Sequence, residues 1–168
     1  MLHVVFLMLI PFSLFSQAEQ EEGWLKLIRQ ADDYSAESKY DSALLISQKI
    51  ALAAEKEDNY EFMTRAYFVM GGVYFRANKL KLASEVYRKA RSSAERWGNE
   101  SFIARADLAE GMVYDELANS TDNLNQASSE LTKVKVFLDS ALYLYKKVKQ
   151  YYLENAPENS LMLANVAD

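Results

Sequence analysis

The chain has 168 residues, of which 26% are charged and 50% hydrophobic, and its net charge at neutral pH is -5. An acidic chain without a concentrated basic face disfavours direct binding to nucleic acid, whose phosphates require one. The sequence has no cysteine, which excludes disulfides and thiolate metal sites, and its single histidine is His3. His3 lies in a segment that we expect to be removed, so the mature chain lacks the side chains of Ser-His-Asp and Cys-His catalysis and of histidine-ligated zinc. We therefore expect no metal site, no cofactor and no enzyme activity in this segment.

The N-terminal residues are typical of an export signal. Residues 4–15 (VVFLMLIPFSLF) are almost wholly apolar, and the first charged residue is Glu19. The run is shorter than the roughly 20 residues of a membrane span. Ser16 and Ala18 predict cleavage after Ala18, with cleavage after Ser16 as an alternative. The absence of a basic residue before the run leaves an uncleaved membrane anchor open. We expect residues 1–18 to be a signal peptide and residues 19–168 to be periplasmic.

Apolar residues recur at helical spacing along the mature chain. The pattern predicts five successive helices, over residues 24–36, 41–56, 62–77, 80–97 and 101–118. Asp41 or Ser42 can cap the second of these helices. Gly98 ends the fourth, because glycine adopts the left-handed conformation without steric penalty.

The next segment departs from this spacing. Residues 138–142 (LDSAL) match residues 40–44 (YDSAL), but the alanine that a step of forty would place at 123 stands at 141, an insertion of eighteen residues. Residues 119–126 are polar and predict a loop. The following residues predict one long helix from about Ser129 to Leu153 that overhangs its partner. A tolerated surface insertion and a contact surface on the overhang are both open interpretations.

The last residues predict the beginning of a further unit. Pro157 is suited to the first position of a helix, and residues 157–168 match the opening of a fourth repeat. The position of that repeat's small residue lies beyond Asp168. We therefore expect this chain to be the N-terminal part of a longer protein. A genuine stop with a frayed tail, or dimerisation over the exposed end, is the alternative.

Several residue types recur at a step of forty. Tyr34, Tyr74 and Tyr114 share this step, and a small residue precedes each of them by three positions. The small residues are Ala31, Gly71 and Gly111, and the same step joins Ala43 with Ala83, Ala54 with Ala94, Glu55 with Glu95, Asn59 with Asn99, and Ala66 with Ala106. Self-similarity at such a period indicates a helical repeat array. Arrays of this kind form extended binding surfaces.

The pattern resembles the tetratricopeptide repeat (TPR) family, in a variant with longer helices, over roughly residues 24–168. The residues at 31, 71 and 111 match the family's small position, and the three tyrosines match its aromatic position one turn later. Ala43, Ala83 and Ala141 match the small position that opens the second helix, whereas Ser47 departs from the aromatic position of Tyr87 and Tyr145. The resemblance implies an all-α, right-handed solenoid of about three and a half repeats, at 24–60, 61–100, 101–156 and 157–168. A non-repetitive helical bundle is the alternative.

The resemblance also implies where a partner binds. In such a solenoid the first helices of the repeats line a concave surface, and residues at equal phase form rows across it. The candidate contacts with a protein or peptide are Arg65, Phe68, Phe75, Arg76, Arg105, Met112, Asp115 and Glu116. Arg65 and Arg105 share a face one repeat apart, and the resemblance suggests that they hold a carboxylate. Alternatively, both arginines pair with acidic residues on neighbouring helices.

Other polar residues are expected to serve the surface. The carboxylate pairs Asp32–Asp33, Asp107–Glu110 and Asp115–Glu116 predict solvated helix faces. Gly71 and Gly72 do not form a phosphate loop, because they lie within a helix and lack the lysine that follows such glycines.

An export signal followed by repeats looks like the N-terminal region of Bacteroidetes sensor kinases and helix-turn-helix regulators. This likeness implies a sensory module of a membrane-linked signal-transduction regulator, with any kinase activity in a further domain. The alternatives are a stand-alone periplasmic scaffold or assembly factor and, third, an enzyme that uses carboxylates or tyrosines. We expect membrane contact only through the signal or a downstream span, and a homodimer is open.

Overall fold

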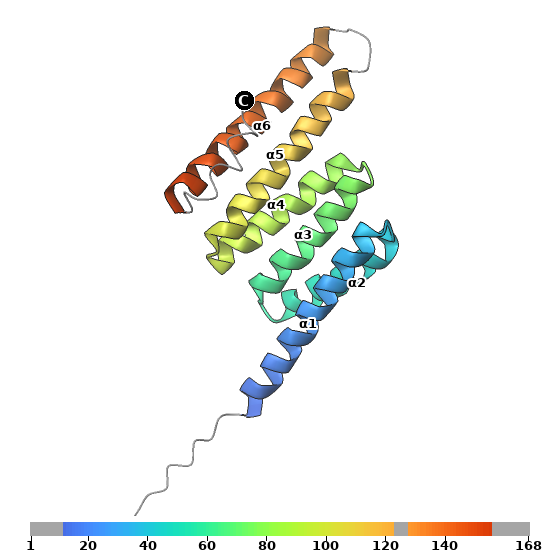
Figure 1. The fold of residues 1–168 in the computed structure, drawn as a ribbon, viewed down its shortest axis with the longest axis vertical. Coiled ribbons are helices and arrows are strands. Elements are labelled where there is room, and N and C mark those ends of the chain that lie inside the picture. Colours follow the sequence, from blue (N-terminus) through green and yellow to red (C-terminus); the bar gives the residue numbers. More distant parts are fainter. Residues whose placement is uncertain (1–11, 123–127, 156–168) are drawn as a thin grey trace, which may run out of the picture.

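The computed structural model describes residues 12–122 and 128–155, which form six α-helices and, within these ranges, no strand. The predicted all-α class is therefore confirmed. The helices are α1 (Phe12–Ala36), α2 (Tyr40–Lys56), α3 (Tyr60–Arg76), α4 (Leu80–Trp97), α5 (Glu100–Asp122) and α6 (Ser128–Asn155). Each helix packs on the next one along the chain (Figure 1). None of the described helices has the length and apolar character needed to cross a membrane.

Two predicted segments fall largely outside this description. Residues 1–11 of the expected signal peptide and residues 157–168 of the expected fourth unit both lie outside the described residues. Helix α1 begins at Phe12 and continues through Ala18, so the helix is longer at its N-terminus than the predicted one over 24–36. Removal of residues 1–18 stays a prediction.

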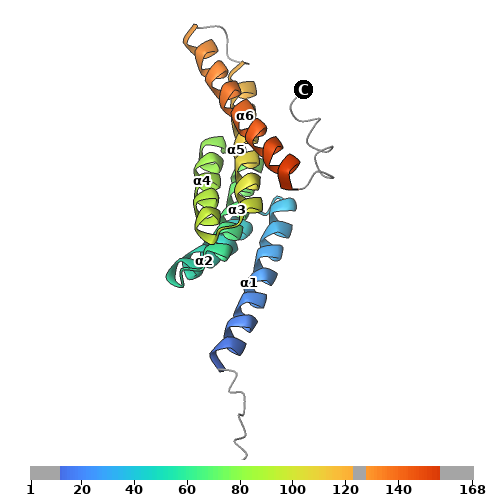
Figure 2. The ribbon, with the colours of Figure 1, turned by 90° about the vertical axis from the view of Figure 1, so that its left-hand side faces the viewer.

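The helices form three hairpins, α1–α2, α3–α4 and α5–α6, that stack in order. Helix α1 contacts α3, and α3 contacts α5, whereas α2, α4 and α6 contact only the helices that are next to them in the chain, within the described residues. Helices α1, α3 and α5 therefore form one layer, which we call the inner layer. In Figure 2, α4 lies to one side of α3 and α5, and α1 lies to the other.

The turns between helices repeat every twenty residues. A residue with positive φ ends each of the first four helices, namely Ser38, Asp58, Asn78 and Gly98, with φ of 62°, 51°, 56° and 75°. The residue after it donates its N–H to a carbonyl five positions back, as Lys39 does to Tyr34 and Lys79 does to Tyr74, both at 2.8 Å. This closure satisfies carbonyls that the helix end leaves free. Twenty-residue spacing of the turns accounts for the step of forty in the sequence.

The starts of the helices differ from the prediction at α2. Helix α2 begins at Tyr40, and Lys39 makes no side-chain cap. Asp41 and Ser42 lie inside the helix, so their predicted capping role is wrong. By contrast, Asn59 and Asn99 cap α3 and α5. Their Oδ1 atoms accept hydrogen bonds from the N–H groups three residues later, at 3.2 and 3.1 Å.

Within a hairpin, the small residue of the first helix lies against the aromatic residue of the second. A Cβ atom at Gly71 would lie 2.6 Å from the Tyr87 ring, and one at Gly111 would lie 2.7 Å from the Tyr145 ring. Neither distance is possible for a real side chain without movement of the ring. In the first hairpin, a buried alanine and a buried serine, Ala31 and Ser47, stand at these positions instead. The departure at Ser47 is thus matched by the presence of a Cβ at residue 31.

The third hairpin is longer than the other two. Helix α5 has 23 residues and α6 has 28, whereas α3 and α4 have 17 and 18. The predicted loop is wrong for residues 119–122, which continue α5, and residues 123–127 lie outside the described residues. The predicted long helix is present as α6, but the insertion lengthens both helices instead of leaving one to overhang the other.

Candidate binding site

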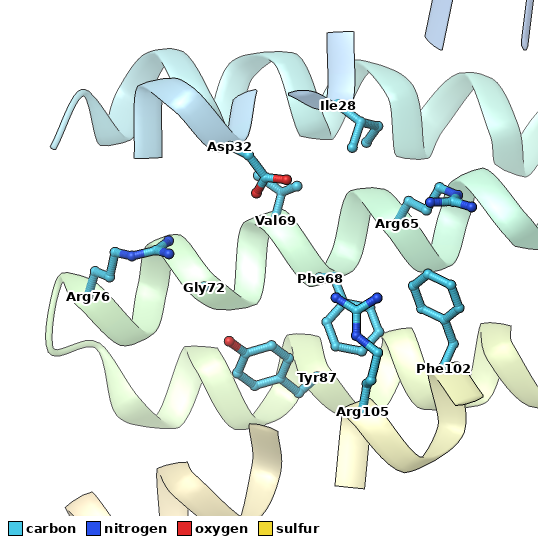
Figure 3. Close-up of a pocket in the computed structure, with 10 residues that line it drawn as sticks. All are labelled: Ile28, Asp32, Arg65, Phe68, Val69, Gly72, Arg76, Tyr87, Phe102 and Arg105. Carbon is cyan, nitrogen blue, oxygen red and sulfur yellow. The ribbon is translucent and has the colours of Figure 1, made fainter. Parts of the chain in front are cut away.

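A concavity of about 220 Å³ lies on the inner layer, where α1, α3 and α5 approach one another. We call it the arginine pocket. Its lining residues are Ile28 and Asp32 of α1; Arg65, Phe68, Val69, Gly72 and Arg76 of α3; Tyr87 of α4; and Phe102 and Arg105 of α5. Figure 3 shows these side chains around the hollow, with Asp32 across from Phe68, Phe102 and Arg105, and with Arg76 and Arg65 toward its two ends. Three successive hairpins therefore contribute to one site.

Aromatic rings position two of the three guanidinium groups. The guanidinium carbon of Arg105 lies 4.7 Å from the centroid of Phe102 and 5.2 Å from that of Phe68. The guanidinium carbon of Arg65 lies 5.2 Å from the centroid of Phe102 and 5.7 Å from that of Trp97. Cation–π contacts of this kind orient an arginine without neutralising it. Phe102 thus holds two cations at one edge of the pocket.

The three arginines differ in their polar partners. Arg65 forms an ion pair at 2.7 Å with Glu61, one turn earlier on its own helix. Arg76 donates from Nη1 to Ser35 Oγ at 2.7 Å, which ties α3 to α1. Arg105 has no carboxylate within ion-pair distance among the described residues. The predicted alternative, in which Arg65 and Arg105 pair with acids on neighbouring helices, therefore does not describe either residue in this structure.

Asp32 is the carboxylate among the lining residues. Although the residue as a whole is exposed, partial burial against the pocket raises the pKa of its carboxyl. The guanidinium of Arg76 opposes this shift, Asp33 adds to it, and Arg105 opposes it further. Burial also raises the pKa of Tyr87 to about 12, so its phenol is neutral and can donate a hydrogen bond near neutral pH. Three guanidinium groups and one carboxylate make the pocket cationic, which suits an anionic group.

The structure brings together half of the predicted contact residues. Arg65, Phe68, Arg76 and Arg105 line the arginine pocket. The others do not line it: Phe75, Met112, Asp115 and Glu116. Phe75 packs against the buried cluster that contains Val113, and Met112 is 46% exposed. Burial raises the pKa of Tyr145 of α6, and the negative charge of Asp115 raises it further.

Sequence reasoning missed Ile28, Val69, Tyr87 and Phe102 as pocket residues. Tyr87 matches the packing position of the repeat, and it does contact Gly71, but the same ring also reaches the pocket. Phe102 is the repeat counterpart of Phe62, which is a core residue at 2% exposure in edge contact with Trp24. A repeat comparison therefore indicates core for both. Arg105 does not separate the two positions, because Arg65 follows Phe62 at the same spacing, so no sequence signal distinguishes Phe102 from the core residue.

A second charged cluster lies on the opposite face of α5, and it overturns one expectation. Asp107 and Glu110 were expected on a solvated face, but their residues are 2% and 7% exposed. Asp107 accepts from Arg91 Nε of α4 at 2.8 Å and from Lys147 Nζ of α6 at 2.5 Å. Periodicity within α5 could not show this, because both partners come from other helices. We call these residues the buried carboxylate cluster.

Glu110 completes the buried carboxylate cluster. Its Oε1 accepts from Ser84 Oγ and Tyr114 Oη, both at 3.2 Å, and lies 3.5 Å from Arg88 Nε. Both carboxylates of this cluster therefore have cationic or hydroxyl partners at hand, which is how buried acids are normally accommodated.

The described residues contain no group of three or more His, Cys, Asp or Glu side chains placed to hold a metal ion. No protein-family model matches the chain, and neither a curated protein nor a solved structure matches it. The geometry of the arginine pocket and the sequence pattern therefore carry the functional argument.

Proposed function

We propose that this chain is a non-catalytic repeat module that binds a protein or peptide segment on its inner layer. The observation that carries the proposal is the arginine pocket, in which Arg65, Arg76 and Arg105 surround a hollow with one carboxylate. The guanidinium of Arg105, which forms no ion pair with a described residue, would engage an acidic group of the partner. Arginine is suited to this task because its planar guanidinium can donate two parallel hydrogen bonds to a carboxylate.

The aromatic residues of the pocket would supply the apolar part of the contact. Phe68 and Phe102 pack edge to face with centroids 5.6 Å apart, so their rings are fixed before a ligand arrives. A pre-ordered site binds with a smaller loss of side-chain entropy. The partner that best fits is an acidic residue next to an apolar one.

The finer description of the fold belongs to the same proposal. We propose a right-handed, TPR-like solenoid of about three and a half repeats. Three observations support it: hairpins that stack in order, turns that recur every twenty residues, and a small residue packed on tyrosine in the second and third hairpins. In such a solenoid the inner layer is the concave surface, where extended ligands bind.

We further propose that the module is exported and forms the extracytoplasmic sensory part of a membrane-linked regulator. The apolar run at residues 4–15 and the resemblance to TPR-containing regulators of Bacteroidetes support this proposal. A stand-alone periplasmic scaffold or assembly factor is the second candidate. Intact-mass measurement of the exported chain tests the signal: a new N-terminus at Glu19 or Gln17 supports export, and retention of residues 1–18 contradicts cleavage.

The gene beyond codon 168 separates the two candidates. A further apolar span of about 20 residues followed by an output domain supports the regulator. Further repeats that end in a polar helix support the scaffold instead.

Binding is tested by panning a random peptide library on the immobilised chain. We expect enrichment of peptides with Asp or Glu beside an apolar residue. Fluorescence anisotropy with the best peptide should show about tenfold weaker binding for Arg105→Gln, since a charge-assisted hydrogen bond is lost. The matched control is Arg29→Gln, an exposed α1 residue outside the pocket. Peptides without acidic residues, or equal affinity for Arg105→Gln and the unaltered chain, would overturn the proposal.

A further inference from the structure

A second hollow, of about 460 Å³, lies at the junction of α5 and α6. Its volume is within the range of small-ligand sites. The lining residues are Glu110, Tyr114, Val136, Asp139, Ser140, Tyr143 and Leu144. Glu110 is five residues after Arg105, which turns the two side chains about 140° apart around the helix. This hollow and the arginine pocket therefore use different faces of α5.

Glu110 presents one carboxylate oxygen to the hollow. Its three neighbours, Ser84, Tyr114 and Arg88, all meet Oε1. None of the described residues contacts Oε2 in the same way. Every fully buried polar side-chain atom in the described part of the chain has a partner, so Oε2 keeps some exposed surface, and Glu110 is one of the residues that line the hollow. A carboxylate that is more than nine-tenths buried, with one oxygen open to a cavity, is prepared for a donor from outside.

The other lining residues favour a positively charged donor with an apolar stem. Asp139 is exposed and adds a second carboxylate. Tyr143 and Val136 are 67% and 56% exposed and form an aromatic and aliphatic wall. Tyr114 is held in a stacked contact with Phe137. Acidic groups beside aromatic faces are the combination that attracts ammonium ions.

The nearby cation does not fill this role. The side chain of Arg88 is 59% exposed, and its Nε lies 3.5 Å from Oε1, longer than a strong charge-assisted bond. Lys147 is held by Asp107 on the other side of the buried carboxylate cluster. Two carboxylates therefore face the hollow against one loosely placed guanidinium.

The repeat does not require these residues. Steps of forty place Met70 and Gln30 at the positions that correspond to Glu110. The step of fifty-eight residues that relates Ala83 to Ala141 also relates Glu85 to Tyr143, so the second hairpin has a glutamate at the position of this tyrosine. Among the three hairpins, a glutamate at the position of Glu110 and a tyrosine at the position of Tyr143 thus occur together only in the third. Residues that depart from a repeat pattern are candidates for function.

We propose that this hollow binds an alkylammonium group, with the ammonium at Glu110 Oε2 and Asp139 and the stem against Tyr143 and Val136. The group can come from a small primary amine or from a lysine side chain of a partner. The site is independent of the proposed peptide site, because it shares no lining residue with the arginine pocket.

The test is titration calorimetry of the full chain with n-butylammonium chloride at constant ionic strength. We expect saturable binding, and we expect no binding of n-butanol, which has the same stem without the charge. Glu110→Gln should weaken binding roughly tenfold or more, because it removes the charged acceptor. Tyr143→Ser, at an exposed position, should weaken binding several-fold by removing a cation–π contact.

Glu22→Gln is the matched control, since it makes the same change of charge at an exposed position on α1. Circular dichroism verifies the fold of each variant. Should Glu110→Gln fail to fold, Asp139→Asn replaces it as an exposed variant that should also weaken binding. Absence of saturable binding, equal binding of n-butanol, or equal affinity for Asp139→Asn and the unaltered chain would overturn the proposal.

A second arm distinguishes the source of the ammonium group. Nα-acetyl-lysine amide presents the same group as a peptide does. Tighter binding of this compound than of n-butylammonium assigns the hollow to a lysine of a partner, and weaker binding assigns it to a free amine.

Discussion

Helix α5 carries two charged regions on different faces, and they differ in how their charges are matched. In the buried carboxylate cluster, Asp107 lies between Arg91 and Lys147, and the residue is 2% exposed. In the arginine pocket, Arg105 rests on two aromatic rings and has no carboxylate at ion-pair distance in the described part of the chain. A carboxylate that is matched by cations of two other helices, such as Asp107, joins those helices, whereas an accessible cation without an ion pair, such as Arg105, is available to a partner. Substitutions in both regions test this comparison.

The largest effect is expected at Asp107. Asp107→Asn leaves two cations without their carboxylate and should lower the free energy of unfolding by about 2–3 kcal/mol, less than for a fully buried pair because both cations are partly exposed. Urea denaturation followed by circular dichroism measures it. Arg105→Gln should cost about 1 kcal/mol or less, since it removes only exposed cation–π contacts. Equal losses for the two variants would erase the distinction between the regions.

An intermediate effect is expected at Gly71, beneath a ring of the arginine pocket. Gly71→Ala places a Cβ 2.6 Å from the Tyr87 ring and should destabilise the chain by about 1–2 kcal/mol through overpacking. In a Tyr87→Ser background, which copies the Ala31 and Ser47 pair of the first hairpin, the same change should cost much less. A double-mutant cycle measures this coupling.

The matched control for Gly71 is Gly111, in the third hairpin. Gly111→Ala should strain the Tyr145 ring to a similar degree, because the corresponding distance is 2.7 Å. Tyr145 does not line the arginine pocket, so this variant should leave peptide binding unchanged while Gly71→Ala weakens it. Additive losses of stability for Gly71→Ala and Tyr87→Ser would contradict the close contact between these two residues. Equal effects of Gly71→Ala and Gly111→Ala on peptide binding would contradict the place of Tyr87 in the arginine pocket.

The smallest effect is expected at Asp32. Burial raises the pKa of this carboxyl in the folded chain, so its charged form is less favourable there than in the unfolded chain. The stabilising contribution of the group is complete below its ordinary pKa of 3.8 and is lost as pH rises through the folded-state pKa. Asp32→Asn should therefore be slightly more stable than the unaltered chain at pH 7 and equal to it in acid. Urea midpoints at both pH values check the sign, and a destabilised Asp32→Asn at pH 7 would contradict it.

The sequence predicted the repeating part of the fold because one-dimensional spacing determines it. The step of forty at Tyr34, Tyr74 and Tyr114 corresponds to turns placed every twenty residues. The alanines at 43, 83 and 141 are buried at 0%, 0% and 3% exposure, as small residues at close helix contacts should be. The start of α2 was less predictable. The turn that precedes α2 depends on the left-handed backbone conformation of Ser38, and a serine in the sequence does not predict that conformation strongly.

The candidate site was predictable only in part, because it depends on contacts between hairpins. Helical phase placed Arg65, Arg76 and Arg105 on one face. It could not show that Arg65 would pair with Glu61, or that Phe102 would contact two guanidinium groups. It also could not show that Asp107 would be buried, since the residues that cover it come from α4 and α6. Sequence spacing gives the direction of a side chain but not its neighbours across the stack.

The way in which the hairpins join has a mechanical consequence. Helices α2, α4 and α6 do not touch one another in the described residues, so successive hairpins meet through α1, α3 and α5 and through the contacts of α2 with α3 and of α4 with α5. A ligand bound in the arginine pocket would therefore contact all three hairpins and fix their relative orientation. Because α6 has 28 residues and is about 42 Å long, a small rotation at its base becomes a large displacement at its tip.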